Sequence, residues 1–256
     1  MSANKAGVHG TRPGGRSGTG RGARYGGDRL GRAVDDVIDE VAAAIRPIKP
    51  RLRGWIHTVT APIALLAGLA LVVVAPTIAL RVAAAVFTLC GLVLFGTSAV
   101  YHRGTWSQKV AAVLRRADHS NIFLLIAGTY TPLSVALLPP ATARTLLLVV
   151  WGGALVGILM RVLWLGAPRW LYVLLYVALG WAAVAVLPAM VAGGGLLVVG
   201  LVVAGGIIYT LGALVYARKW PDPSPTWFGF HEIFHVCTVL GWLAHWLAAL
   251  LAVLAR

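Results

Sequence analysis

The amino-acid sequence predicts an all-α membrane protein, a bundle of seven transmembrane helices. Of its 256 residues, 59% are hydrophobic and only 12% are charged, whereas soluble domains carry about 25% charged residues. The chain also contains seven apolar runs of spanning length, because about 20 residues at 1.5 Å each cross a hydrocarbon core roughly 30 Å thick. Backbone groups in lipid must be hydrogen-bonded within their own segment, so these runs are predicted to be helices rather than strands.

The segment before the first apolar run divides into two parts. Residues 1–32 are rich in Gly and Arg and nearly lack apolar side chains, so we predict a disordered cytoplasmic tail, because little burial offsets the entropy of ordering it. Residues 33–54 place apolar side chains at helical spacing beside a group of acidic ones. This pattern predicts a short amphipathic helix that ends before Pro47, followed by a linker. An acidic face suits anionic lipid poorly, which favours docking on the cytoplasmic side of the bundle.

The transmembrane domain is predicted to occupy residues 55–256. Two cysteines, Cys90 and Cys237, fall inside its apolar runs, where a buried thiol is the common role, so no disulfide framework is predicted. In order along the chain, the predicted spans are residues 55–75, 77–100, 121–138, 142–163, 170–190, 196–215 and 230–254.

Lys and Arg are distributed unevenly among the connections between these runs, and this asymmetry predicts the orientation. The amino-terminal segment and the connections after the second, fourth and sixth runs hold 19 of the 22 Lys and Arg residues. The opposite side receives only Arg81, Arg144 and Arg256. With seven crossings, the amino terminus is predicted to be cytoplasmic and the carboxyl terminus to lie outside. The net charge of +14 reflects this sidedness beside a negatively charged leaflet, and we expect no binding of nucleic acid.

The last apolar run begins with "FHEIFHVCTVLGWLAHW", which contains a formal match to the H-E-x-x-H zinc pattern. His231 and His235 are four residues apart, so they lie on one face of a helix and are placed to hold one ion. In a soluble zinc protease Glu232 would be the general base. Such a site needs a third ligand, and only His245 follows, with no acid after Glu232. The alternative third ligand is His102, far upstream.

The predicted topology brings several polar side chains to one membrane depth. His102 ends the second run, Asp118 begins the third, and His231 with His235 begins the seventh, all on the cytoplasmic side. Ligating groups from three helices at one level are what a metal site requires, and zinc accepts three protein ligands while a fourth position stays open for water. Asp118 would hydrogen-bond a zinc-bound water or act as its base. Ser98 lies one turn deeper than His102, and such a group of residues is suited to hydrolysing an amide or ester.

Structural roles remain open for each of these residues. The paired histidines of the last run are also suited to hydrogen bonds between helices. Asp118 stands where a helix N-cap is expected, and a serine such as Ser98 commonly bonds the carbonyl four residues before it. His245 lies deeper and is predicted to be a packed polar residue rather than a ligand. His57 and His119 are near the right depth, but neither has a partner at ligand spacing.

Three motifs, in order on the second, third and seventh runs, carry a resemblance to a known family. They are "SAVYH", "RADHSNIFLLIAGTYTP" and "FHEIFHVCTVLGWLAH". Together they resemble the haemolysin III branch of the progestin and adipoQ receptor superfamily, over about residues 50–254. The same pattern of serine, aspartate and three histidines unites that superfamily with the alkaline ceramidases. The resemblance implies a seven-helix protein, amino terminus inside, that binds Zn2+ through His102, His231 and His235, with Ser98 and Asp118 beside the zinc-bound water.

Three functions remain open from the sequence. The first is a zinc-dependent hydrolase that cuts an amide in a membrane lipid. The second is a non-enzymatic membrane protein with structural zinc, either a receptor-like regulator of membrane lipid state or a pore. The third is an intramembrane metalloprotease that uses Glu232. The fourth to sixth runs are nearly featureless Leu, Val, Ala and Gly, which argues against a wide channel. The expected partner is membrane lipid, as substrate or ligand, the expected location is the cell membrane, and the oligomeric state is left open.

Overall fold

The computed structural model describes residues 50–164 and 166–256. Within these residues the chain consists of helices and their connections, with one isolated bridge between Ser224 and Phe228. The predicted tail of residues 1–32 and the predicted amphipathic helix that ends before Pro47 lie outside the described residues, so both stay predictions. Residues 51–54 form turns that lead into the first described helix.

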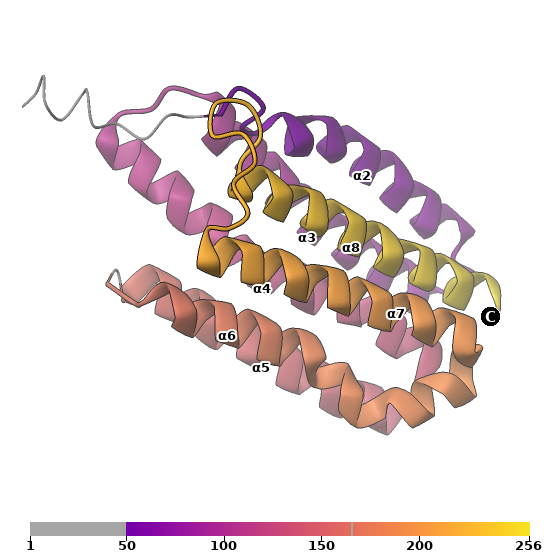
Figure 1. Ribbon diagram of the computed structural model, residues 1–256. Helices are drawn as coiled ribbons and strands as arrows, with labels where there is room; N and C mark the ends of the chain where they lie inside the picture. Colours follow the sequence, from indigo (N-terminus) through magenta and orange to yellow (C-terminus); the bar gives the residue numbers. More distant parts are fainter. Residues whose placement is uncertain (1–49, 165) are drawn as a thin grey trace, which may run out of the picture. The chain divides into compact units, whose positions relative to one another are not determined.

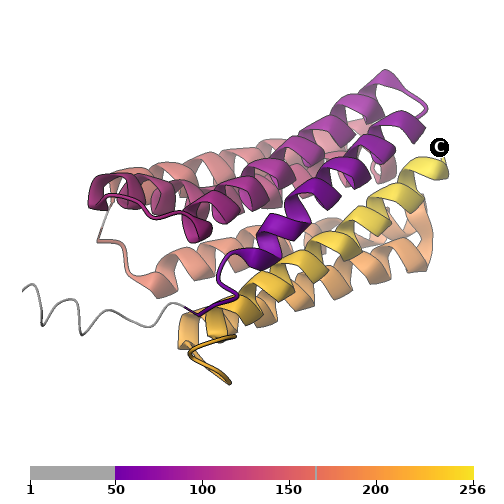
Figure 2. The same ribbon diagram turned by 90° about the horizontal axis from the view of Figure 1, so that it is seen from above.

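The helices of the described part lie side by side along a common direction (Figure 1). The carboxyl terminus lies at the opposite end of this bundle from the start of the first described helix, as both Figure 1 and Figure 2 show. In chain order the helices are α2 (Trp55–Val74), α3 (Ile78–Arg103), α4 (Gln108–Leu137), α5 (Pro140–Leu163), α6 (Arg169–Gly180), the 3-10 helix η1 (Trp181–Val186), α7 (Leu187–Arg218) and α8 (Phe230–Leu254).

Helix α4 is at the centre of the bundle. It packs against α3 and α5, its neighbours in the chain, and also contacts α6, α7 and α8. Of its most apolar stretch 72% is buried, whereas the corresponding value for α5 is 22%. Helix α8 packs mainly on α7 and also contacts α2 and α4. The ends of α3, α4 and α8 are therefore brought together by packing, although α8 is far from the other two in sequence.

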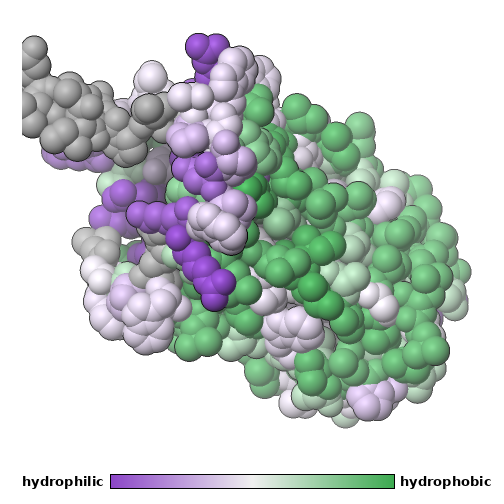
Figure 3. Space-filling view, in the orientation of Figure 1, coloured by the Kyte–Doolittle hydropathy of each residue, from purple (hydrophilic) through white to green (hydrophobic). Residues whose placement is uncertain are grey.

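The outer surface of the bundle is apolar, as expected of a chain in contact with lipid. Val73, Leu148 and Leu196 are 76%, 69% and 79% exposed. Figure 3 shows hydrophobic residues over most of the visible face, with hydrophilic residues gathered at one end. In the described part, six helical stretches are long and apolar enough to cross a membrane. The protein is therefore an all-α membrane protein, as the sequence predicts.

The fifth of these stretches, Trp170–Arg218, has 49 residues. A straight helix of that length would measure about 74 Å, more than twice the thickness of a hydrocarbon core. The stretch is interrupted, because Gly195 has φ 76° and ψ 173°, a conformation outside the helical region. Side chains rarely allow this backbone geometry, and glycine adopts it without steric cost. The break falls between the predicted spans of residues 170–190 and 196–215.

Helix α4 begins at Gln108, well before the predicted start of the third span at Asn121. Ser107 caps this earlier start, since its hydroxyl accepts a hydrogen bond from the backbone N–H of Val110 at 3.5 Å. Hydropathy detects only the apolar part of a helix, whereas the backbone hydrogen bonds continue into its polar first turns. Asp118 is consequently inside α4, and the interpretation of this residue as an N-cap is wrong.

Candidate metal centre

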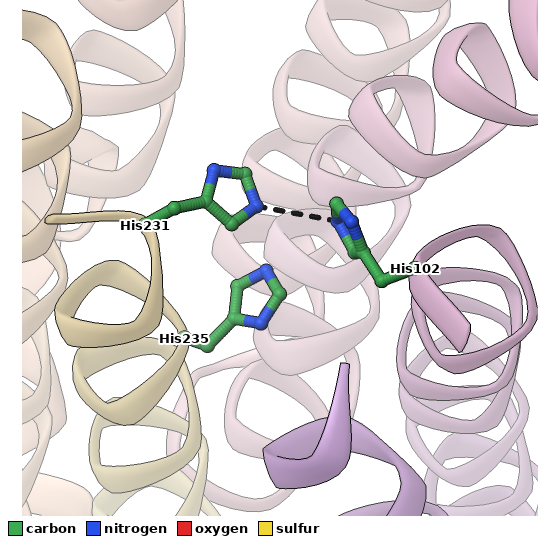
Figure 4. A group of neighbouring side chains, drawn as sticks. All are labelled: His102, His231 and His235. Carbon is green, nitrogen blue, oxygen red and sulfur yellow. Dashed lines mark hydrogen bonds between the residues drawn. The ribbon is translucent and has the colours of Figure 1, made fainter. Parts of the chain in front are cut away.

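Three imidazoles meet at one end of the bundle (Figure 4). His102 belongs to the last turn of α3, and His231 and His235 belong to the first turns of α8. One ligand nitrogen from each ring lies within 4.8 Å of the other two. The Nε2 atoms of His102 and His231 are 3.2 Å apart. The structure thus brings together the three histidines that the resemblance implies as zinc ligands.

The start of α8 fixes the position of two of these rings. The backbone N–H of Gly229 donates to Oε2 of Glu232 at 2.9 Å, and the N–H of Phe230 donates to Oδ1 of Asp222 at 2.9 Å. Both bonds satisfy N–H groups that the first helical turn leaves without a partner. From this capped start, His231 and His235 follow on one face because they are four residues apart.

Gly54 fixes the position of the third ring. This residue has a φ of +84°, which glycine adopts freely. A Cβ atom here would lie 2.8 Å from Cβ of His102, so a larger residue would displace the end of α3. Because the turn before α2 packs closely against the end of α3, it fixes the position of His102, the third histidine of the group.

The histidine group is buried. His102 and His235 are 6% and 1% exposed, and the His231 imidazole is buried although the residue as a whole is partly exposed. The ring of His57 in α2 stacks on that of His235, with centroids 3.9 Å apart and planes 17° apart. Neither ring nitrogen of His57 has a hydrogen-bond partner within the described residues. Sequence spacing provided no signal for this contact, since the two residues are on the first and last described helices.

Asp118 and Ser98 complete the surroundings of the group. Oδ2 of Asp118 lies 3.6 Å from Nε2 of His102, and the aspartate is 6% exposed. Ser98 lies near Asp118, and its buried hydroxyl has no hydrogen-bond partner among the described residues. The bond from this hydroxyl to the carbonyl four residues earlier is therefore not formed. Asp118 thus lies beside His102, and Ser98 precedes His102 by one turn on the same face of α3.

The donor set fits zinc by its chemistry and its spacing. Tetrahedral zinc binds imidazole nitrogen at about 2.0–2.1 Å, which places two such nitrogens roughly 3.3 Å apart. The 3.2 Å between the nitrogens of His102 and His231 matches this value. The third nitrogen is within 4.8 Å of both, so a small shift of the His235 ring completes a three-nitrogen face.

Two other polar residues of α8 are engaged away from this group. Glu232 is fully buried, pairs with Arg53, and accepts the N–H of Gly229. It therefore caps and anchors the helix. His245 stacks on Tyr209 with ring centroids 5.4 Å apart, and it is not a member of the histidine group.

An apolar cavity of about 110 Å³ lies among the helices, and its lining includes neighbours in the sequence of the histidine group but none of its three members. Leu94, one turn from Ser98, lines it from α3, and Phe234 and Thr238 line it from α8 beside His235. Most of its other walls come from apolar residues of α4, α6, η1 and α7. The cavity accommodates part of a hydrocarbon chain better than a polar molecule.

A family model with the description "Haemolysin-III related" matches residues 45–246. A hemolysin-3 homolog of Bacillus subtilis (strain 168) is 35% identical over 151 residues, which cover 56% of this chain and 69% of that protein. Hemolysin-3 of Bacillus cereus is 28% identical over 211 residues, which cover 78% of this chain and 88% of that protein. Because the family model spans most of the chain and the bundle has an apolar surface, the protein is a multi-pass integral membrane protein that belongs to the haemolysin-III related family.

Proposed function

We propose that this protein is a zinc-dependent hydrolase that cuts an amide bond in a membrane lipid. The observation that carries this proposal is the meeting of three buried imidazoles with the Asp118 carboxylate beside an apolar cavity. Structural zinc centres are closed by four protein ligands, whereas catalytic centres use three and leave one position open. Within the described residues the group offers three nitrogens, which favours the catalytic type.

Each side chain has a role that its position supports. His102, His231 and His235 would hold the ion. When bound, zinc would lower the pKa of a coordinated water toward about 7 and polarise a carbonyl group. Asp118 would accept the proton released from water and pass it to the leaving amine. The buried Ser98 hydroxyl would donate a hydrogen bond to the substrate carbonyl oxygen.

The lipid nature of the substrate is supported by the cavity. Its lining includes residues one turn from Ser98 and residues beside His235, so an acyl chain held there would place its carbonyl carbon near the group. Burying a hydrocarbon chain in such a cavity favours binding in proportion to the apolar area removed from water. The exposed apolar faces of the helices suit a substrate that enters sideways from the bilayer.

We infer that the chain crosses the membrane seven times. The 49-residue stretch would be two spans that meet at Gly195, one of residues 170–194 and one of residues 196–218. The uneven distribution of Lys and Arg then supports an amino terminus in the cytoplasm and a carboxyl terminus outside. In this topology the histidine group would lie near the cytoplasmic face, and residues 1–54 would be a cytoplasmic tail and helix.

A pore is the second candidate, and the names of the two Bacillus relatives favour it. A conducting path needs polar groups or water along its length. The interior cavity is lined chiefly by apolar side chains, which favours lipid over ions as its occupant. A receptor-like regulator of membrane lipid state, with zinc as a structural clamp, would use the same cavity without chemistry.

The deciding experiment compares wild type with Asp118→Asn. Purified protein is assayed for zinc and for fatty acid released from ceramides and related N-acyl lipids. Because Asn cannot accept the proton, we expect kcat to fall by about 10²- to 10⁴-fold with zinc content unchanged. Asp222→Asn is the matched control, since Asn still accepts the N–H of Phe230 in the exposed loop. Wild type that holds one zinc per chain but releases no fatty acid would overturn the hydrolase, and leakage of liposomes in proportion to protein would favour the pore.

A further inference from the structure

A second polar cluster lies beside the histidine group and centres on Arg161, in the last turn of α5. An arginine at the end of a helix commonly bonds the last free carbonyls, but Arg161 is only 9% exposed and contacts His119 of α4 and Tyr172 of α6. Its Nη2 lies 2.6 Å from Nδ1 of His119. The guanidinium carbon lies 4.5 Å from the centre of the Tyr172 ring. Nε of Arg161 is buried and has no hydrogen-bond partner in the described part of the chain.

The positive charge of Arg161 has no carboxylate partner among the described residues. Asp118, Asp222 and Glu232 contact His102, the N–H of Phe230 and Arg53, respectively, and none of these contacts is with Arg161. A guanidinium cannot be deprotonated in a protein. Arg161 therefore cannot lower the free-energy cost of its burial by losing its charge. A buried charge without a counterion is costly, and an ionisable residue inside a membrane bundle is by default a functional site.

His119 does not offset this charge. Arg161 has only N–H donors, so Nδ1 of His119 must accept, and the neutral ring carries its proton on Nε2. That nitrogen is 3.3 Å from the Tyr216 hydroxyl. The ring of Tyr216 is in turn 5.8 Å from that of His231. The Arg161 cluster is therefore joined to the histidine group through His119 and Tyr216, and these two side chains bring no negative charge to Arg161.

We propose that Arg161, with Tyr172, binds the oxyanion of an anionic membrane lipid, such as a phosphate group. Arginine is the side chain best suited to phosphate and carboxylate oxygens. Tyr172 lies in the first turn of α6, where the helix dipole also favours negative charge. This assignment goes beyond the proposed hydrolase, because the site would bind its ligand whether or not the histidine group carries out any chemistry.

Lipid is favoured over a soluble anion as the source of this group. Val162 and Leu163, which follow Arg161, are 47% and 76% exposed, so the arginine is at a level where the bundle still presents apolar surface. Tyr176 donates a hydrogen bond of 2.8 Å to the carbonyl of His119 and also lines the apolar cavity. An anion bound here would lie beside space suited to a hydrocarbon chain, which free phosphate cannot fill.

The test measures lipid binding by native mass spectrometry of the full chain in neutral detergent. Phosphatidylglycerol and phosphatidylcholine with identical chains are titrated into wild type, Arg161→Gln, Arg161→Lys and Arg218→Gln. Arg218 is the matched control, because it is an exposed arginine in the last turn of α7. We expect wild type and Arg218→Gln to prefer phosphatidylglycerol by about tenfold or more, as one charge-assisted contact allows. Arg161→Gln should lose this preference and Arg161→Lys should retain part of it.

Equal binding of both lipids by wild type would overturn the proposal, and so would a preference that survives in Arg161→Gln. If Arg161→Gln fails to fold, Arg161→Lys decides the question, because a preference equal to that of wild type in this variant would overturn the assignment to the guanidinium. Competition with inorganic phosphate separates the two sources, because displacement of the lipid at equal concentration would identify a soluble anion as the ligand. His102→Ala should keep the preference for phosphatidylglycerol while it loses zinc. The lipid site and the proposed hydrolase can therefore be rejected independently of one another.

Discussion

At the scale of single residues, Glu232 is the side chain whose position changes the interpretation of the H-E-x-x-H pattern. In a zinc protease this glutamate faces the metal as a base. Here it is fully buried, pairs with Arg53 and accepts the N–H of Gly229. Its carboxylate therefore holds the start of α8 against the turn before α2. The two histidines on either side keep their positions because this glutamate is an anchor.

Replacement of Glu232 tests this anchoring role. Glu232→Gln keeps an acceptor for Gly229 but removes the charge that pairs with Arg53. We expect unfolding in detergent to show a loss of about 1–3 kcal/mol, with zinc content and lipid hydrolysis retained in the protein that stays folded. Complete loss of hydrolysis at full zinc occupancy and unchanged stability would instead assign Glu232 as the base.

Replacement of His102 tests whether this residue is a zinc ligand. His102→Ala removes one of the three nitrogens, and we expect zinc affinity to fall by more than the roughly 10–100-fold seen when outer-shell partners of metal ligands are removed. His245→Ala is the control, since that histidine is on the same helix as two of the proposed ligands but stacks on Tyr209. Measurement is by metal analysis after dialysis against a graded chelator. Equal zinc retention by both variants would exclude His102 as a ligand.

At the scale of helices, close packing of α4 on its neighbours places Asp118 beside the histidine group. Small residues allow this approach, as is typical of membrane helix interfaces. A Cβ atom at Gly128 of α4 would lie 2.6 Å from Cβ of Cys90 in α3. The contact holds the middle of α3 against α4. It thereby keeps the two helices aligned, so that His102 and Asp118, which lie nearer their connection, stay close together.

We therefore expect Gly128→Val to destabilise the bundle by about 1–3 kcal/mol, as overpacking does in other cores. The loss should appear as a lower Tm in detergent, together with weaker zinc retention. Gly96→Val on α3 is the matched control, because a Cβ atom there would meet nothing within 4 Å. An unchanged Tm in Gly128→Val would contradict the close helix contact.

At the scale of the whole molecule, the buried charged residues and the candidate site lie at the same end of the bundle. The described helices bury their charged residues Asp118, Arg161 and Glu232 at one end, where the histidine group is also found. Figure 3 shows hydrophilic residues gathered at one end of the visible face as well. Water that takes part in hydrolysis would reach the group from that end, while lipid would approach along the apolar sides.

Reporter fusions test the inferred topology. Alkaline phosphatase is active only outside the cytoplasm, so we expect activity when it is fused after Arg256 and none when it is fused after Lys219. A fluorescent protein that folds only in the cytoplasm should give the reverse pattern. Six crossings would place the carboxyl terminus on the same side as the amino terminus. An inactive phosphatase at Arg256 would therefore show that the stretch Trp170–Arg218 is not divided into two spans at Gly195.

The sequence by itself determined the helical class, the membrane location and most helix positions. Residues 230–254 are predicted as the last span, and α8 has the same bounds. This agreement arises because apolar length and side-chain period are local properties, which need no knowledge of neighbours. The start of α4 was the main exception, since its first turns are polar and are held by backbone hydrogen bonds that hydropathy does not detect.

The candidate site was predicted only in part, because motifs name residues but not all of their neighbours. His102, His231 and His235 could be found from their spacing, their shared depth and their resemblance to a family. The stacking of His57 on His235 and the pairing of Arg53 with Glu232 could not, and that last pair is separated by 179 residues in the sequence. Contacts of this kind depend on which helix faces meet, and only the tertiary structure decides that, because the packing of whole helices determines it.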